Sequence, residues 1–163
     1  MQTTHEHLVD WLRDAYAMEV QAEKMLSNMA DRLEDYPVLK ARLLQHVAET
    51  RNQAVLVEQC LHQLNADTSM LKTGIGAITG TAQAFSGVFA SDEVVKGAVF
   101  GAAFEYYEII NYKILVMAAE AAGETGIAAT LERILDEERR MAEWMQDNLP
   151  TILGEYLMTG NKR

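Results

Sequence analysis

Four long stretches of this sequence carry apolar residues at alternating spacings of three and four positions. This spacing returns a side chain to the same side of an α-helix, so each stretch predicts a helix with one buried seam. The expected helices run from about 3 to 35, from 37 to about 65, from 92 to about 122, and from 124 to 149. The composition, rich in Ala, Leu, Met and Glu with only two prolines, also favours helix over strand.

The breaks between these stretches predict how the helices are connected. Pro37 separates the first two helices and Gly123 the last two, which predicts two tight antiparallel hairpins. Pro150 is expected to end the fourth helix, with a short amphipathic C-terminal helix after it. The glycine-containing stretch 66–91, with Ser91 as the expected cap of the third helix, joins the hairpins.

A connection of that length can climb the whole bundle, so the second and third helices are expected to run parallel. This is the topology of a ferritin-like four-helix bundle, in which residues 1–163 form a single domain. A simple up-and-down bundle with a disordered or lid-like loop would leave the same sequence pattern, and is the alternative.

Each expected seam is interrupted by charged or polar residues at apolar positions. These residues are Glu19 on the first helix, His46, Glu49 and Gln53 on the second, Glu105 and Glu108 on the third, and Glu138 on the fourth. On the second helix, Glu49 is the expected inward carboxylate. Burying an unpaired carboxylate costs several kcal/mol, so this group needs protons or cations to neutralise it.

The five carboxylates are also predicted to share one level of the bundle. With a rise of about 1.5 Å per residue, Glu19 and Glu49 lie roughly 25 and 20 Å from the first hairpin turn. On the same basis Glu105, Glu108 and Glu138 lie roughly 28, 23 and 22 Å from the second turn. A common level in the core predicts one site for two metal ions.

The ligand types narrow the choice of metal. Carboxylate oxygens with at most one imidazole suit iron or manganese, while zinc and a site without metal are the alternatives. His46 and Gln53 are further candidate ligands. Tyr16, Tyr107 and Tyr112 could line or approach the cavity as hydrogen-bond partners, while packing in the core with a satisfied hydroxyl is the favoured alternative for each.

The charge of the chain excludes several classes of partner. A net charge of -10 and an isoelectric point near 4.8 argue against nonspecific binding to nucleic acid or to anionic lipid. The uncharged stretch 73–91 is too polar for a convincing membrane span, and residues 1–10 lack the pattern of a secretion signal. Cys60 is the only cysteine, which excludes an intramolecular disulfide and fits a reducing cytoplasm.

Over nearly its whole length the chain resembles the YciE/YciF-type bacterial stress proteins of the ferritin-like superfamily. The matching segments are Glu19, His46-Val-Ala-Glu-Thr-Arg-Asn-Gln53, Ser91-Asp-Glu-Val-Val-Lys-Gly97, Glu105-Tyr-Tyr-Glu-Ile109 and Asp136-Glu-Glu138. The resemblance implies a rubrerythrin-like dimetal centre, a homodimer and a link to general or osmotic stress, with no settled reaction. The sequence departs from the wider Glu-x-x-His pattern at Asn52 and Met141, which stand where histidines are usual.

Two functions of different classes follow. The first is a redox-active dimetal protein that oxidises iron(II) or consumes peroxide or oxygen. The second is a noncatalytic dimeric stress or scaffold protein with a relict or structural carboxylate site. A storage ferritin ranks third, because nothing in the sequence indicates the surfaces of a closed cage.

Overall fold

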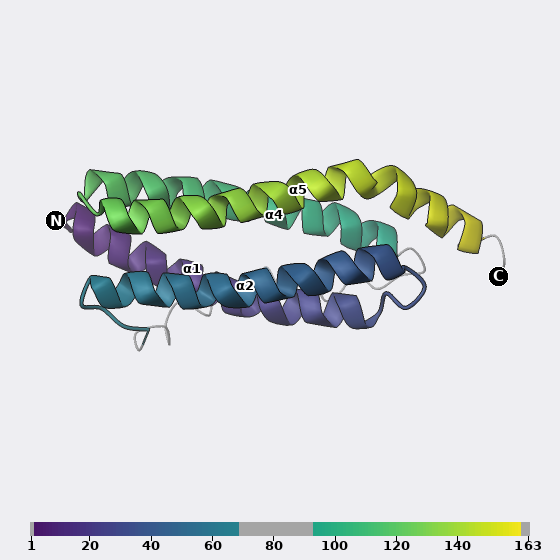
Figure 1. Ribbon diagram of the computed structural model, residues 1–163, viewed down its shortest axis with the longest axis horizontal. Coiled ribbons are helices and arrows are strands. Elements are labelled where there is room, and N and C mark those ends of the chain that lie inside the picture. The colour runs from purple at the N-terminus through teal and green to yellow at the C-terminus, as the bar shows by residue number, and fades with distance from the viewer. Residues whose placement is uncertain (1, 69–92, 161–163) are drawn as a thin grey trace.

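The computed structural model describes residues 2–68 and 93–160, which form a bundle of four long α-helices. The helices are α1 (Thr4–Asp31), α2 (Pro37–Gln63), α4 (Glu93–Ala121) and α5 (Thr125–Gly160). Figure 1 shows them lying along one axis, with α2 and α4 running in the same direction. The predicted bundle of two hairpins is therefore confirmed, while most of the expected connection, and Ser91, lie outside the described residues.

The packing of the helices brings the two hairpins together side by side. Within each hairpin α1 packs on α2 and α4 packs on α5, while α1 contacts α4 and α2 contacts α5 between hairpins. Helices α1 and α5 thus lie diagonally across the core, as do α2 and α4. Among the described helices none is long and apolar enough to cross a membrane.

Local sequence accounts for where the first hairpin begins and turns. A capping box opens α1, because the Thr3 side chain accepts from the Glu6 N–H while the Glu6 carboxylate accepts from the Thr3 N–H. The helix ends at Asp31, earlier than expected. Tyr36 precedes Pro37 and is non-helical, at φ -126 and ψ 66, because the proline ring disfavours helical backbone before it.

The expectation that Pro150 ends the fourth helix is wrong. Helix α5 continues through it to Gly160, so no separate C-terminal helix forms, and Figure 1 shows the C-terminal part of α5 changing direction. Proline removes the hydrogen bond that would reach the carbonyl of Gln146, which bends a helix without always stopping it. Ile152, only 4% exposed, packs with the buried residues of the other helices and so favours continued helix beyond the proline.

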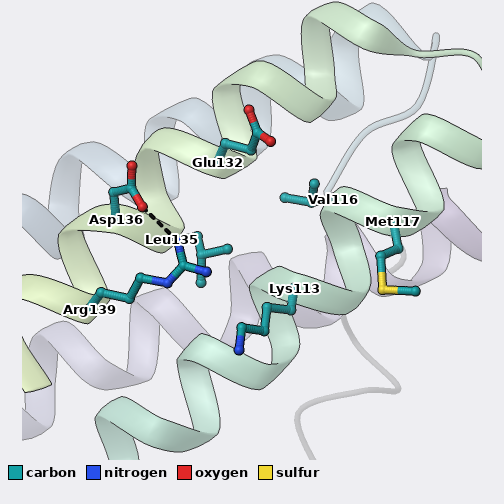
Figure 2. Close-up of a pocket in the computed structure, with 7 residues that line it drawn as sticks. All are labelled: Lys113, Val116, Met117, Glu132, Leu135, Asp136 and Arg139. Atoms are coloured by element: carbon teal, nitrogen blue, oxygen red, sulfur yellow. Dashed lines mark hydrogen bonds and ion pairs between the residues drawn. The ribbon is translucent and has the colours of Figure 1, made fainter.

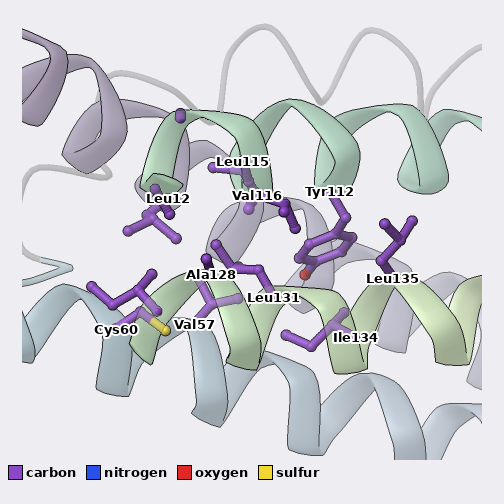
Figure 3. Close-up of a cluster of buried hydrophobic side chains, with 14 of the residues drawn as sticks. Leu12, Val57, Cys60, Tyr112, Leu115, Val116, Ala128, Leu131, Ile134 and Leu135 are labelled. Carbon is purple, nitrogen blue, oxygen red and sulfur yellow. The ribbon is translucent and has the colours of Figure 1, made fainter. Parts of the chain in front are cut away.

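The apolar core is divided into two clusters with polar residues between them. The first cluster gathers Leu12, Val57, Tyr112 and Leu131 and their neighbours, as Figure 3 shows. The second, toward the other end of the bundle, contains Leu26, Leu43, Ala98, Met141, Met145 and neighbouring residues. Between the clusters lie seven buried polar or charged residues: Glu19, His46, Thr50, Gln53, Glu105, Glu108 and Glu138.

Candidate metal centre

All four helices contribute to this buried polar layer. Glu19, Glu105, Glu108 and Glu138 are each at most 1% exposed, as their seam positions predict. On α2 most of the buried positions follow the same alternating spacing as the other seams when counted from the start of the helix: Leu39, Leu43, His46, Thr50, Gln53, Val57 and Cys60. That register brings His46 and Gln53 into the core.

The same register leaves Glu49 one position away from the seam, which corrects its expected inward orientation. Its side chain is 24% exposed, and its carboxylate accepts hydrogen bonds from Arg42 at 3.2 Å and from Gln45 at 2.9 Å. It also lies 2.8 Å from Nδ1 of His46. Glu49 therefore reaches the buried layer through His46.

Four of the predicted residues form a compact cluster. His46, Glu105, Glu108 and Glu138 each offer one ligand atom, and these atoms all lie within 4.8 Å of one another. His46 Nε2 lies 3.3 Å from Glu105 Oε2 and 3.5 Å from Glu138 Oε2, on the opposite side of the ring from Glu49. The histidine thus connects the cluster with the partly exposed carboxylate.

Six buried polar atoms of this layer have no hydrogen-bond partner among the described residues. These atoms are Glu19 Oε2, His46 Nε2, Gln53 Oε1, Glu105 Oε2, Glu108 Oε1 and Glu138 Oε2. Buried polar atoms without partners are rare because each costs about 1–3 kcal/mol. Five oxygens and one imidazole nitrogen are donor atoms that iron and manganese accept, so the residues fit a metal centre.

Burial controls the protonation of these carboxyl groups in the protein without metal. Loss of solvation raises the pKa of Glu19 to about 8, and raises the pKa of Glu108 and Glu138 well above the usual value, with neighbouring carboxylates adding to the shift for all three. For His46, burial lowers the pKa, but the nearby carboxylates of Glu105 and Glu138 and the hydrogen bond with Glu49 outweigh it and raise the pKa to about 10. Protons therefore neutralise the layer when no cation does.

Glu19 and Gln53 lie beside the cluster, each held by a hydrogen bond. Tyr112 donates its hydroxyl proton to Glu19 Oε1, in keeping with the expected role of a tyrosine near the cavity, whereas Tyr107 is 53% exposed and does not lie in the buried layer. Gln53 donates from Nε2 to Glu138 Oε1 and, at 2.9 Å, to Glu137 Oε2. Both side chains retain one unpartnered oxygen, as the three glutamates of the cluster do.

Two residues of this layer were not found from the sequence. Thr50 is 1% exposed, and extending the three-and-four spacing from Leu39 along α2 would have found it. Glu137 lies next to Glu138 on the side of α5 that meets α2, where it accepts the hydrogen bond from Gln53. No seam position indicates Glu137, since it lies one residue off the α5 seam.

Proteins of solved structure share this architecture over most of their length. A protein from Xanthomonas campestris pv. campestris is 40% identical, with a TM-score of 0.83 over 98% of this chain and 99% of its own. The E. coli stress protein YciF is 21% identical, with a TM-score of 0.82 over 94% and 99%. Ferritin-like, diiron-carboxylate proteins from Bacillus anthracis are 17% identical, with a TM-score of 0.74 over 91% and 99%.

Paired hairpins around a buried carboxylate layer, together with these structural relatives, define a ferritin-like four-helix bundle. The resemblance to YciF-type proteins of the ferritin-like superfamily is confirmed. A family model described as a domain of unknown function, DUF892, matches residues 3–158, so the chain belongs to the DUF892 family.

Proposed function

We propose that this protein binds two metal ions, iron or manganese, between its four helices and uses them in redox chemistry with oxygen or peroxide during stress. The observation that carries the proposal is the set of unpartnered buried oxygens and one imidazole nitrogen converging from all four helices. Glu19, His46, Glu105, Glu108 and Glu138 would hold the ions. Two such ions, when bound, can exchange electrons with iron(II), oxygen or peroxide.

The charge of the layer supports two divalent ions. Glu19, Glu105, Glu108 and Glu138 are the four buried glutamates among the residues that the structure describes, so their ionised carboxylates carry four negative charges. Two divalent cations balance that charge once the protons leave. His46 would act as a neutral ligand, with the proton on Nδ1 donated to Glu49 and the lone pair of Nε2 facing Glu105 and Glu138.

Gln53 and Glu49 have supporting places in this proposal. Gln53 Oε1 lacks a partner and is available to an ion, while its amide N–H groups position Glu138 and Glu137. Glu49 acts through the imidazole of His46. The names of two structural relatives, a diiron-carboxylate protein and a stress protein, are consistent with the proposed metal and setting. We place the function in the cytoplasm, where the buried Cys60 would stay reduced.

Metal stoichiometry tests the proposal. The untagged protein would be reconstituted anaerobically with iron(II) or manganese(II), and the metal per chain measured by plasma mass spectrometry. We expect about two ions per chain in the parent and few in a Glu19→Ala, Glu105→Ala double variant. A control with two exposed glutamates changed, Glu120→Ala and Glu143→Ala, should bind as the parent does. Negligible metal in the parent would reject the dimetal site.

The redox part needs a separate measurement. Iron(II)-loaded protein would be mixed with oxygen or with hydrogen peroxide, and the iron oxidation state followed by Mössbauer spectroscopy. Oxidation of the bound iron faster than that of free iron(II) is expected. Bound iron that keeps its oxidation state would favour the second function, a noncatalytic stress or scaffold protein that acts as a homodimer. The exposed apolar side chains of α4, among them Ile110 (52% exposed) and Met117 (67%), are the observation that favours this alternative.

A further inference from the structure

The residues of the buried layer lie almost out of contact with solvent. Its four glutamates and His46 are each at most 1% exposed. Apolar residues of the two core clusters close the bundle along its axis on either side of the layer. A metal cation that reaches these residues from water must therefore pass between two helices.

The two hairpins meet along two boundaries, one between α1 and α4 and one between α2 and α5. At the first boundary, the buried ring of Tyr112 extends from α4 and places its hydroxyl on Glu19 of α1. A buried ring offers a cation no exposed oxygen at this boundary. The second boundary is therefore the better candidate for a passage.

The boundary between α2 and α5 is polar from the surface to the core. Half-buried Glu137 accepts a hydrogen bond at 2.9 Å from Gln53 Nε2, and the same nitrogen donates to Glu138 in the cluster. Gln53 Oε1 is buried and has no hydrogen-bond partner among the described residues. Carboxylate and amide oxygens can replace water around a hard cation, so this boundary offers ligands at each depth.

Three successive acids on α5 show why Glu137 faces this boundary. Successive residues of a helix are turned by about 100°, so Asp136, Glu137 and Glu138 face three directions. Figure 2 shows Asp136 in a groove between α4 and α5, where Arg139 pairs with it at 2.8 Å. Glu138 faces the core, and Glu137 faces α2. Among these three acids, only Glu137 connects the surface with the layer.

Glu49 is another partly exposed carboxylate that contacts the layer, but its oxygens are already engaged. Oε2 accepts from Arg42 and lies against His46 Nδ1, while Oε1 accepts from Gln45. The guanidinium of Arg42 repels a cation that approaches. Glu137 receives its hydrogen bond from a neutral amide, and is the better acceptor for a cation.

We infer that metal cations enter the layer between α2 and α5, past Glu137 and Gln53, an inference that rests on the proposed metal binding. Glu137 attracts cations from water, and its charge raises their concentration at this boundary. The hydrogen bonds of Gln53 join the first hairpin to the second, so they must open to admit a cation. Glu137 thus controls the rate of uptake and is not one of the ligands that hold the ions.

The rate of metal uptake tests the passage. Metal-free protein would be mixed anaerobically with manganese(II), and the loss of free metal followed by stopped flow with a fluorescent indicator. Glu137→Gln should lower the second-order rate constant about 10-fold and leave the final metal per chain unchanged. Asp136→Asn is the matched control, because it removes the same charge from a neighbouring residue outside this boundary, and it should take up metal as the parent does.

Salt and a second variant test the role of charge. Added sodium chloride should slow uptake more in the parent than in Glu137→Gln, because it screens the charge that attracts the cation. Glu137→Lys should be slower still, with the parent's helicity by circular dichroism.

Three outcomes would overturn the passage: uptake by Glu137→Gln at the parent's rate, equal slowing in Asp136→Asn, or loss of bound metal at equilibrium in Glu137→Gln. A parent that binds no manganese(II) would reject the proposed function as well. Normal binding with an unchanged rate in Glu137→Gln would reject the passage alone.

Discussion

At the residue scale, the roles of neighbouring side chains depend on which atom each one faces. Glu49 and the cluster lie on opposite sides of the His46 ring, with Glu49 at Nδ1 and Glu105 and Glu138 at Nε2. A carboxylate at Nδ1 fixes the ring orientation and makes the other nitrogen a better ligand. The periodicity of the sequence identifies which residues share a helix face, but it does not show which ring nitrogen of His46 faces which carboxylate.

The partnership of Glu49 with His46 gives a testable prediction. Glu49→Ala should lower the affinity for manganese(II) about 10- to 100-fold, because His46 loses its orienting acceptor. Titration calorimetry on metal-free protein measures this. Glu49→Gln keeps an acceptor oxygen and should recover part of the loss. Glu58→Ala, on the same helix and away from the cluster, should bind as the parent does, and an unchanged affinity in Glu49→Ala would contradict the role.

Tyr112 carries a second prediction at this scale. Tyr112→Phe removes the hydroxyl that donates to Glu19 and leaves a buried carboxyl oxygen without its partner. The free energy of unfolding of the metal-free protein should fall by about 1–3 kcal/mol, as measured by urea denaturation. Tyr107→Phe, at a 53% exposed position, should change it by less than about 0.5 kcal/mol. Equal effects of the two changes would count against a structural role for this hydrogen bond.

At the scale of the helices, the sequence predicted the four elements but not all of their details. The seams of α1, α4 and α5 are long and regular, so Glu19, Glu105, Glu108 and Glu138 were predicted as buried, and they are. The α2 seam contains His46, Thr50 and Gln53 in succession, and three polar positions hid its register. Pro150 was predicted to end the fourth helix because helix propensity is a local property. It does not take account of the burial of Ile152, which stabilises the helix beyond the proline.

The turn between α4 and α5 gives a prediction with opposite signs at two glycines. Gly123 has φ +79, whereas Gly126 lies in the first turn of α5, and neither has an atom within 4 Å of an added Cβ. Gly123→Ala should lower the free energy of unfolding by about 1 kcal/mol, because an L side chain disfavours that backbone. Gly126→Ala should raise it by up to about 1 kcal/mol by favouring helix. Thermal melts of both variants check the signs.

At the scale of the whole molecule, the common level of the acidic residues was predictable because helix rise is constant. Counting from the two hairpin turns placed the carboxylates together, and the structure brings those of α1, α4 and α5 into one layer with His46. Glu49 belongs to that level but is turned partly outward, which the rise does not reveal.

The buried layer predicts how stability depends on pH. Glu19, with its pKa raised to about 8, holds a proton that the unfolded chain releases from about pH 4.5 upward. The free energy of unfolding of the metal-free protein should therefore fall between about pH 5 and pH 8. His46, with its pKa raised to about 10, adds a further loss of stability that begins above about pH 6.5. For Glu49, burial raises the pKa, but His46 and Arg42 outweigh it and lower the pKa to about 2. The stability that Glu49 contributes is therefore lost only below about pH 4.5.

Metal should reverse this trend, since bound ions replace the protons and bind more tightly as the carboxylates ionise. Melting temperatures at pH 5, 6, 7 and 8, measured with a chelator and with manganese(II), would check both statements. A metal-free melting temperature that rises across this range would contradict the assignment of buried protonated carboxyls.

The cluster joins the two hairpins: His46 belongs to the first, while Glu105, Glu108 and Glu138 belong to the second. An ion held by these residues would add a bond between the two hairpins, which already pack against each other through α1 on α4 and α2 on α5. It would leave only when the hairpins part, so the rate of metal release would be limited by the rate at which the bundle opens. The rate at which the bound ion exchanges with an added isotope would then measure the rate of bundle opening, which equilibrium stability does not report.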